Sequence, residues 1–301
     1  MKHIFIVNPV SGKGKAVKFI PFINEYFMGN SDAYEIIVTE KPKDATSIAH
    51  RYTKEDDVVL YSLGGDGTAK EILDGLNEGV TMCVVPGGTG NDFYKSVDGR
   101  RLSDNEILKG LIEGENILID YGILNGTSRF MNIASFGVDA DINVYACDVL
   151  KVKYNIPGKL VYAIAALMVG TKPQNIGMDI TVDGLEFKRT AVLAAIANGK
   201  CYGGTFKPAP DGIFDDGYFD FCIVNGPIPL KRFFQLIVKY AKGAHVGEKE
   251  VEMIHAKHIK IKFDHPVNLQ IDGENYRMSD ADIKIVPHGL SIRVPRSREV
   301  K

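Results

Sequence analysis

Three glycine-rich segments carry residues whose types and spacing suit the binding of phosphate. One is Gly64-Gly65-Asp66-Gly67-Thr68, directly after the apolar run at 58–63, and another is Pro86-Gly87-Gly88-Thr89-Gly90-Asn91-Asp92, after the run at 82–85. The run at 4–7 likewise ends in Asn8-Pro9-Val10-Ser11-Gly12. Glycine lets the backbone approach an anion closely, and a helix that begins behind the loop adds unpaired N–H groups and its dipole.

Asp66 lies inside one of these loops, where a bound phosphate would repel its carboxylate. A cation between them removes the repulsion, and Mg²⁺ with its preference for oxygen ligands fits that place. A single loop of this kind is also compatible with a tight strand-to-helix turn and an exposed aspartate. Three loops that each follow a strand favour a shared ligand site.

Two common nucleotide motifs are excluded. No GxxxxGK[ST] sequence surrounds Gly12 or Gly64, and a GxGxxG pattern that starts at Gly12 fails at Val17. The chain therefore has neither a Walker loop nor a dinucleotide fingerprint.

The elements that must position these loops alternate between strands and helices in the first third of the chain. Strands are expected at 4–7, 34–38, 58–63 and 82–85, and helices near 17–27, 43–51 and 69–77. This order is typical of βαβ units and a parallel sheet, whose ligands bind at the carboxyl ends of the strands.

Beyond about residue 123 the pattern changes to strands separated by turns, which predicts a mostly antiparallel β-sandwich. Strands are expected at 129–135, 178–182, 186–197, 218–224, 259–263, 267–271, 282–286 and 291–294, and helices near 159–170 and 230–241. We expect an α/β nucleotide-binding domain at 1–122 and a β-rich lipid-substrate and metal-binding domain at 123–289. The tail at 290–301 is expected to pack back on the first domain.

Composition sets the broad class of protein. The 301 residues are 45% hydrophobic and 25% charged with a net charge of −2, so they form sizeable cores without the positive field of a nucleic-acid-binding protein. The longest apolar run, Leu160–Val169, has ten residues against the roughly 20 that span a bilayer. A cytoplasmic protein with no transmembrane segment and reduced cysteines is expected.

The two glycine loops together resemble the catalytic domain of diacylglycerol kinases, sphingosine kinases and bacterial lipid kinases. NAD kinases and phosphofructokinases carry related glycine-aspartate loops on a similar sheet. The likeness runs from Asn8-Pro9 near the start to Asp272-Gly273-Glu274 near the end. It implies an ATP-dependent lipid kinase that takes diacylglycerol to phosphatidic acid.

In the bacterial members, ATP is held by the Asn-Pro loop, by a threonine that ends the second strand, and by the two glycine loops. The resemblance therefore implies ATP-binding residues at Asn8, Pro9, Val10, Ser11, Gly12, Thr39, Gly64, Gly65, Asp66, Gly67, Thr68, Ala69, Lys70, Gly88, Thr89, Gly90 and Asn91. Lys70 departs from the family, which usually has Asn there, and a lysine would meet phosphate as a point charge.

The resemblance also implies a magnesium site and a general base. The metal would be held by Asp216 with the carbonyls of Ile213 and Tyr218, and coupled through water to Asp66 and Asp92. The Asp-Asp-Gly sequence at 215–217 is equally typical of a β-turn. The base would be Asp272 or Glu274, which face the same side if the strand stays extended.

A lipid acceptor requires contact with a membrane surface. The segment 231–242 combines bulky apolar residues with four cations, as in a helix at an anionic interface or in an ordinary amphipathic helix. We expect peripheral membrane association, no nucleic-acid partner, and a homodimer as the commonest oligomer. The alternatives are a kinase of a soluble acceptor such as NAD and a catalytically silent nucleotide-binding regulator.

Overall fold

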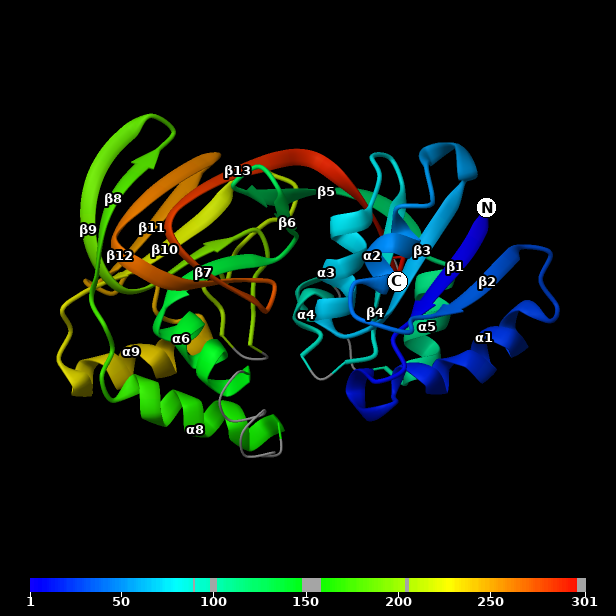
Figure 1. Cartoon of the computed structure of the whole chain (residues 1–301), viewed down its shortest axis with the longest axis horizontal. Coiled ribbons are helices and arrows are strands. Elements are labelled where there is room, and N and C mark those ends of the chain that lie inside the picture. Colours follow the sequence, from blue (N-terminus) through cyan, green and yellow to red (C-terminus); the bar gives the residue numbers. More distant parts are fainter. Residues whose placement is uncertain (89, 98–101, 148–157, 204–205, 297–301) are drawn as a thin grey trace, which may run out of the picture. The chain divides into compact units, whose positions relative to one another are not determined.

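The chain folds into two compact units. The computed structural model describes residues 1–88, 90–97, 102–147, 158–203 and 206–296. Unit 1 comprises Met1–Tyr121 and the C-terminal segment from Pro287, and unit 2 comprises Gly122–Val286. Two strands, β5 (Glu115–Leu124) and β13 (Glu274–Val294), contain the unit boundaries, so each contributes residues to both units (Figure 1).

Unit 1 is built on a parallel sheet. Its strands are β1 (Lys2–Val7), β2 (Ala33–Val38), β3 (Val58–Gly64) and β4 (Thr81–Pro86). The order is β4-β3-β1-β2, all parallel, and the end of β13 adds a further parallel strand beside β4. β3 and β4 are buried throughout, which explains their continuous apolar sequences.

Helices connect these strands as a parallel sheet requires. They are α1 (Phe19–Phe27), α2 (Asp44–Ala49), α3 (Asp66–Gly75), α4 (Asp92–Val97) and α5 (Asp104–Ile112). The core of unit 1 joins apolar residues of α1 and α5 to the sheet residues Phe5, Tyr61 and Cys83. The α/β architecture expected from the sequence is confirmed.

The C-terminal strand is tied to unit 1 by a buried arginine. Arg293 donates Nε–H to Leu111 O (2.9 Å), Nη1–H to Asn116 Oδ1 (2.8 Å) and Nη2–H to Ile112 O (2.8 Å). Leu111 and Ile112 form the last turn of α5, whose carbonyls lack partners within the helix. A residue close to the end of the chain thus caps a helix of the first unit.

Unit 2 is mainly antiparallel. Its strands are β6 (Ser128–Phe130), β7 (Ile133–Gly137), β8 (Ile176–Val182), β9 (Leu185–Ala197), β10 (Phe219–Asn225), β11 (Val251–Ala256) and β12 (His258–Ile271), with helices α6 (Val138–Val144), α8 (Gly158–Gly170) and α9 (Leu230–Lys242). β9 and β12 are connected twice, through β7 and through β8, so these strands close around a core.

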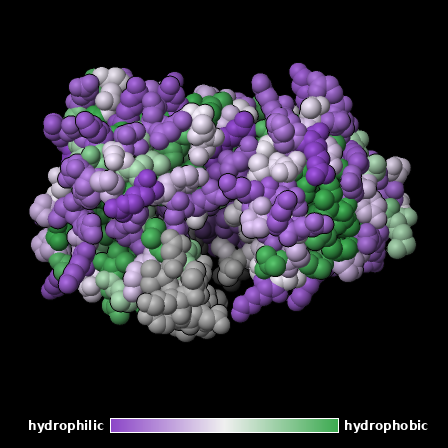
Figure 2. Space-filling view, viewed as in Figure 1, coloured by the Kyte–Doolittle hydropathy of each residue, from purple (hydrophilic) through white to green (hydrophobic). Residues whose placement is uncertain are grey.

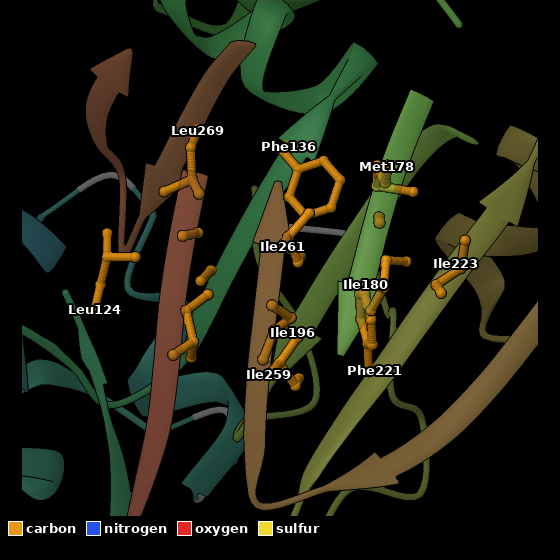
Figure 3. Packing of buried hydrophobic residues seen from close by; sticks show 14 of the residues in the cluster. Leu124, Phe136, Met178, Ile180, Ile196, Phe221, Ile223, Ile259, Ile261 and Leu269 are labelled. Carbon is orange, nitrogen blue, oxygen red and sulfur yellow. The ribbon is translucent and has the colours of Figure 1, made fainter. Parts of the chain in front are cut away.

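That core consists of the inward residues of the antiparallel strands. Figure 3 shows Phe136, Ile196, Phe221, Ile261 and Leu269 among those that pack together, and each of these is at most 2% exposed. The alternation of buried and exposed residues along β8 is the period-two pattern of a strand with one buried face. The β-rich second domain is therefore also confirmed.

Several expected strands differ in extent. The runs 259–263 and 267–271 form one strand, β12, with an irregularity between Lys262 and Val267. The runs 282–286 and 291–294 both belong to β13. The run 129–135 is split between β6 and β7 because the backbone amides of Met131 and Asn132 bond to a side chain, Asp272, rather than to a neighbouring strand.

Candidate active site

The glycine loops of unit 1 touch one another at the carboxyl ends of their strands. A Cβ atom on Gly12 would lie 2.4 Å from Gly87 O, and one on Gly88 would lie 2.3 Å from Gly65 Cα. Such distances are far below van der Waals contact, so glycine is needed at both places. The loops after β1, β3 and β4 therefore meet, as the sequence predicted.

Side chains fix these loops further. Asn8, after β1, donates Nδ2–H to Thr68 Oγ1 (3.0 Å), and the Thr68 side chain lies against Gly64, where a Cβ would be 2.3 Å from Oγ1. Thr39, after β2, is buried and donates its amide to Val7 O (2.9 Å). Residues that follow all four strands thus gather at one edge of the sheet.

Asn91 and Asp66 organise the loop after β4. Asn91 has a left-handed backbone (φ 54°), accepts the Gly88 amide on Oδ1 (3.0 Å) and donates Nδ2–H to Gly88 O (3.2 Å). The Asp66 carboxylate accepts the amides of Asn91 (2.9 Å) and Asp92 (2.8 Å). Thr89, expected in this loop, lies outside the described residues.

The carboxylates of Asp66 and Asp92 form a donor set that suits a divalent cation. A Cβ on Gly90 would lie 2.5 Å from Asp66 Oδ2 and 3.6 Å from Asp92 Oδ2, so both oxygens flank this glycine. Burial first, and then the charge of Asp92, raise the pKa of Asp66. A cation would relieve this repulsion, and Mg²⁺ is commonly held by one or two carboxylates together with phosphate oxygens.

The remaining expected ATP-binding residues surround these contacts. Pro9 and Val10 form a turn whose Val10 amide bonds to Asn8 Oδ1 (3.2 Å), and the Ser11 amide bonds to Asn8 O (3.2 Å). Gly67 and Ala69 lie in the first turn of α3, which begins at Asp66. The leading N–H groups of a helix lack intrahelical partners and are suited to an anion.

Lys70 forms an ion pair within α3. Its side chain is fully buried, and Nζ donates to Asp74 Oδ2 (2.5 Å), one turn further along the helix. That Lys70 meets phosphate as a point charge stays a prediction.

The Asp272-Gly273 turn of unit 2 is held by its own backbone and side chain. Asp272 and Gly273 have φ of 45° and 91°, and Ile271 pairs with Glu274, which makes a tight hairpin between β12 and β13. The Asp272 carboxylate accepts the amides of Met131 (2.8 Å), Asn132 (3.2 Å) and Ile133 (2.9 Å). The strand therefore does not stay extended here, so the condition under which both acids were expected to face one side is not met.

Glu274 and Asp272 consequently differ in environment. Glu274 is half-buried, and its Oε2 accepts the hydroxyl of Tyr276 (2.9 Å). Two residues missed from the sequence also hold this turn: Gln270 Oε1 accepts the Gly273 amide (2.9 Å), and Asn143 of α6 donates to Gly273 O (3.2 Å). Their position next to the turn depends on the pairing of strands, which no local sequence signal reveals.

The expected metal loop at 213–218 is exposed and acidic. Asp216 accepts the Tyr218 amide on Oδ1 (2.9 Å), a contact typical of an Asx turn, and Ile213 is 54% exposed. Burial is the main cause that raises the pKa of the neighbouring Asp220, and the charge of Asp216 adds to it. The turn interpretation of this sequence is supported, and its oxygen-rich side chains are compatible with Mg²⁺.

Across the described ranges, no cluster of three or more His, Cys, Asp or Glu side chains is arranged to enclose a metal ion. Among the helices of those same ranges, none is both long and apolar enough to cross a bilayer.

Both units match known families of protein domains. Residues 2–124 match the diacylglycerol kinase catalytic domain, and residues 132–294 match the YegS C-terminal NAD kinase beta sandwich-like domain. A diacylglycerol kinase of Staphylococcus aureus (strain MRSA252) is 31% identical over 278 residues, which cover 89% of this chain and 84% of that protein. One from Staphylococcus carnosus (strain TM300) is 29% identical over 298 residues, 97% of this chain and 94% of that protein.

Solved structures share the fold. A diacylglycerol kinase of Bacillus anthracis str. Sterne has a TM-score of 0.71 at 22% identity, covering 97% of this chain and 96% of that one. An NAD kinase from Archaeoglobus fulgidus in complex with ATP has a TM-score of 0.51 at 12% identity, covering 98% and 94%. From the domain matches and the coverage of the staphylococcal relatives we conclude that the chain belongs to the diacylglycerol kinase family and is a kinase with an alcohol acceptor.

Proposed function

We propose that this protein transfers the γ-phosphate of ATP to the hydroxyl of a lipid, with diacylglycerol as the first candidate. The convergence of three strand-end loops beside Asp66 and Asp92 supports nucleotide binding. The names of the staphylococcal relatives support the acceptor. The observation that carries the proposal is the contact of Gly88 with Gly65, which creates a side-chain-free surface where a phosphate chain can approach.

The loops of unit 1 supply binding and positioning. Backbone amides at the start of α3 would hold the phosphates, and Asp66 and Asp92 would hold Mg²⁺. The ion would neutralise phosphate charge during transfer, which is the main requirement of phosphoryl-transfer catalysis. Asp216 remains a second candidate ligand, in unit 2.

Within the Asp-Gly-Glu turn we assign the base to Glu274. Asp272 uses both carboxylate oxygens to accept three backbone amides, and a carboxylate stabilised in this way is a weak proton acceptor. Glu274 is half-buried, and its Oε2 accepts the hydroxyl of Tyr276 (2.9 Å). Glu274 would take the proton of the acceptor hydroxyl, while Asp272 holds the turn.

A lipid acceptor also calls for a surface that meets a membrane. The outward side of α9 carries Leu230, Phe234 and Val238, which are 43%, 40% and 56% exposed, with Lys231 and Lys242 beside them. Leu167 and Met168 of α8 are exposed as well, and Phe234 lies near Gly170 at the end of that helix. Figure 2 shows hydrophobic surface over this part of unit 2. We propose that this surface contacts the lipid bilayer.

The test is transfer of labelled γ-phosphate from ATP to detergent-dispersed diacylglycerol, other lipid alcohols and NAD, with and without Mg²⁺. We expect a labelled lipid, and about 10²- to 10⁴-fold slower transfer by Glu274→Gln with unchanged ATP affinity. Label on NAD alone would overturn the lipid acceptor. Full activity of Glu274→Gln would overturn the assignment of the base.

A further inference from the structure

Two buried polar side chains, Gln270 and Ser135, are hydrogen-bonded to each other next to the Asp272-Gly273-Glu274 turn. Gln270, which is 4% exposed, accepts the Gly273 amide on Oε1 (2.9 Å) and donates Nε2–H to Ser135 Oγ (2.6 Å). Ser135, fully buried, is the cross-strand partner of Gln270 in the pairing of β7 with β12. One amide side chain therefore connects the turn to the interior of unit 2.

A carboxylate side chain, Asp139, follows Ser135 in the sequence. β7 ends at Gly137, whose φ of 95° turns the backbone into α6 and places Asp139 in the first turn of that helix. Tyr202 donates its hydroxyl to Asp139 Oδ2 (2.6 Å). The other oxygen, Oδ1, is buried and has no hydrogen bond to a described residue. Burial raises the pKa of Asp139, and the side chains of Ser135 and Tyr202 lower it.

The direction of these bonds is consistent. Gln270 donates to the Ser135 hydroxyl oxygen, and Tyr202 donates to the Asp139 carboxylate. The other titratable groups that act on Asp139 or feel its charge are Tyr240 on α9 and Cys222 on β10.

Two buried polar side chains cost folding free energy unless they are hydrogen-bonded, and Gln270 bonds both Ser135 and the Gly273 amide. We propose that Gln270 and Ser135 form a positioning network that fixes the Gly273 peptide and thereby the carboxylate of Glu274 for proton removal from the acceptor hydroxyl. This inference rests on the proposed role of Glu274.

The network is tested with Gln270→Met, which keeps the side-chain length and removes both hydrogen bonds. We expect kcat to fall about 10- to 100-fold, as for small misplacements of a reacting group, while KM for ATP stays unchanged. Gln270→Glu retains an acceptor for the Gly273 amide, so it is expected to recover part of kcat relative to Gln270→Met.

Asn268→Leu is the matched control. Asn268 lies two residues earlier on β12 and donates to Asp141 Oδ1 (2.7 Å) of α6, so it loses a similar bond that does not reach the turn. We expect its kcat to remain near wild type, with a lowered melting temperature. Equal loss of kcat in Asn268→Leu and Gln270→Met, or wild-type kcat in Gln270→Met, would overturn the positioning network.

The two proposals fail in different ways. If Glu274→Gln abolishes transfer while Gln270→Met does not slow it, the base stands and the network is wrong. If Glu274→Gln transfers phosphate at the wild-type rate, the base is wrong, and the network loses the group that it was proposed to position.

Discussion

At the scale of single residues, the Asp-Gly-Glu sequence separates into two different tasks. Sequence spacing alone left Asp272 and Glu274 as equivalent candidates for the base. The structure distinguishes them because Asp272 has a left-handed backbone and gives its carboxylate to the amides of residues 131–133. These hydrogen bonds join residues about 140 positions apart in the sequence, so no local sequence pattern predicts them.

The contact of Gly88 with Gly65 gives a test of the proposed phosphate binding by these loops. Gly88→Ala would place a methyl group 2.3 Å from Gly65 Cα and force the two loops apart. We expect ATP to bind at least about tenfold more weakly, a loss of about 1.4 kcal/mol. ATP affinity is measured by calorimetry. Gly29→Ala is the control, because its methyl group would meet no described atom within 4 Å; an equal loss there would contradict the explanation.

Asp139 makes unfolding dependent on pH in a defined direction. Burial raises its pKa from 3.8 to about 6 in the folded protein. The folded state therefore binds this proton more tightly than the unfolded state, and stability falls as pH rises from about 4 to about 6. At 1.36 kcal/mol per pKa unit, the ionised carboxylate costs about 3 kcal/mol at neutral pH.

Asp139→Asn should remove that cost. We expect the free energy of unfolding of the variant, relative to wild type, to increase by about 3 kcal/mol between about pH 4 and about pH 7. Urea unfolding at several pH values measures it. A difference that stays constant with pH would show that Asp139 does not titrate in this range.

At the scale of elements, the sequence predicted strands and helices best where one face is buried. The strands of unit 1 and the buried second half of β9 follow from continuous apolar runs, and β8 follows from its alternation of buried and exposed residues. β11 was missed because Val251–Ala256 has five half-buried or exposed residues out of six and little apolar contrast. β12 and β13 were each predicted in two pieces because polar residues at exposed positions interrupt their apolar runs.

The candidate site was predictable only in part for the same reason. A glycine loop after a buried strand is recognisable from the local sequence. Because the carboxyl ends of parallel strands lie at one edge of the sheet, the meeting of these loops could be inferred. The orientation of Lys70 could not, because its burial depends on how α3 packs. The roles of Gln270 and Ser135 depend on the register of β12 with β7, which residue types do not encode locally.

The contacts of helix α9 show which of its cations form ion pairs within unit 2. Arg232 and Lys239 form ion pairs with two glutamates that precede β11. Arg232 donates to Glu250 (2.7 Å), and both cations contact Glu248. Two of the four cations expected at a membrane are therefore engaged within unit 2. Lys231 and Lys242 remain beside the exposed apolar stripe on the outward side.

We therefore expect Lys231→Gln and Lys242→Gln each to weaken binding to anionic vesicles about fivefold, since a cation near such a surface contributes about 1 kcal/mol. Phe234→Ser should weaken binding further, and at all salt concentrations, because it removes apolar area that the membrane would bury. Co-sedimentation with vesicles measures both. Lys249→Gln is the charge-matched control, being exposed and outside α9; an equal effect there would indicate nonspecific attraction.

At the scale of the whole molecule, unit 1 is discontinuous in sequence. The C-terminal part of β13 pairs with β4, and Arg293 caps α5, so the last described residues complete the first unit. β5 and β13 are also tied within each unit, by the His288 amide on Asp120 Oδ1 (2.7 Å) in unit 1 and the Asp282 amide on Asn125 Oδ1 (2.7 Å) in unit 2.

Arg293→Met should destabilise the protein by roughly 2–4 kcal/mol, because it leaves two helix carbonyls and the Asn116 side chain without this buried partner. Urea unfolding measures the loss. Arg277→Met is the control, since Arg277 is exposed and its Nη1 reaches Asn268 Oδ1 at 3.2 Å; we expect a change below about 0.5 kcal/mol there. Equal losses would contradict the capping role of Arg293.

The discontinuity of unit 1 has a consequence for biosynthesis. Met1–Tyr121 leaves the ribosome first, but its sheet lacks the β13 strand and α5 lacks its arginine cap until Gly122–Val286 has been made. At roughly 5–20 residues per second, the nascent first part of unit 1 waits on the order of ten seconds or more with an open sheet edge beside β4. Unit 2, contiguous in the chain, can close first, so the half that is translated first is the half that finishes folding last.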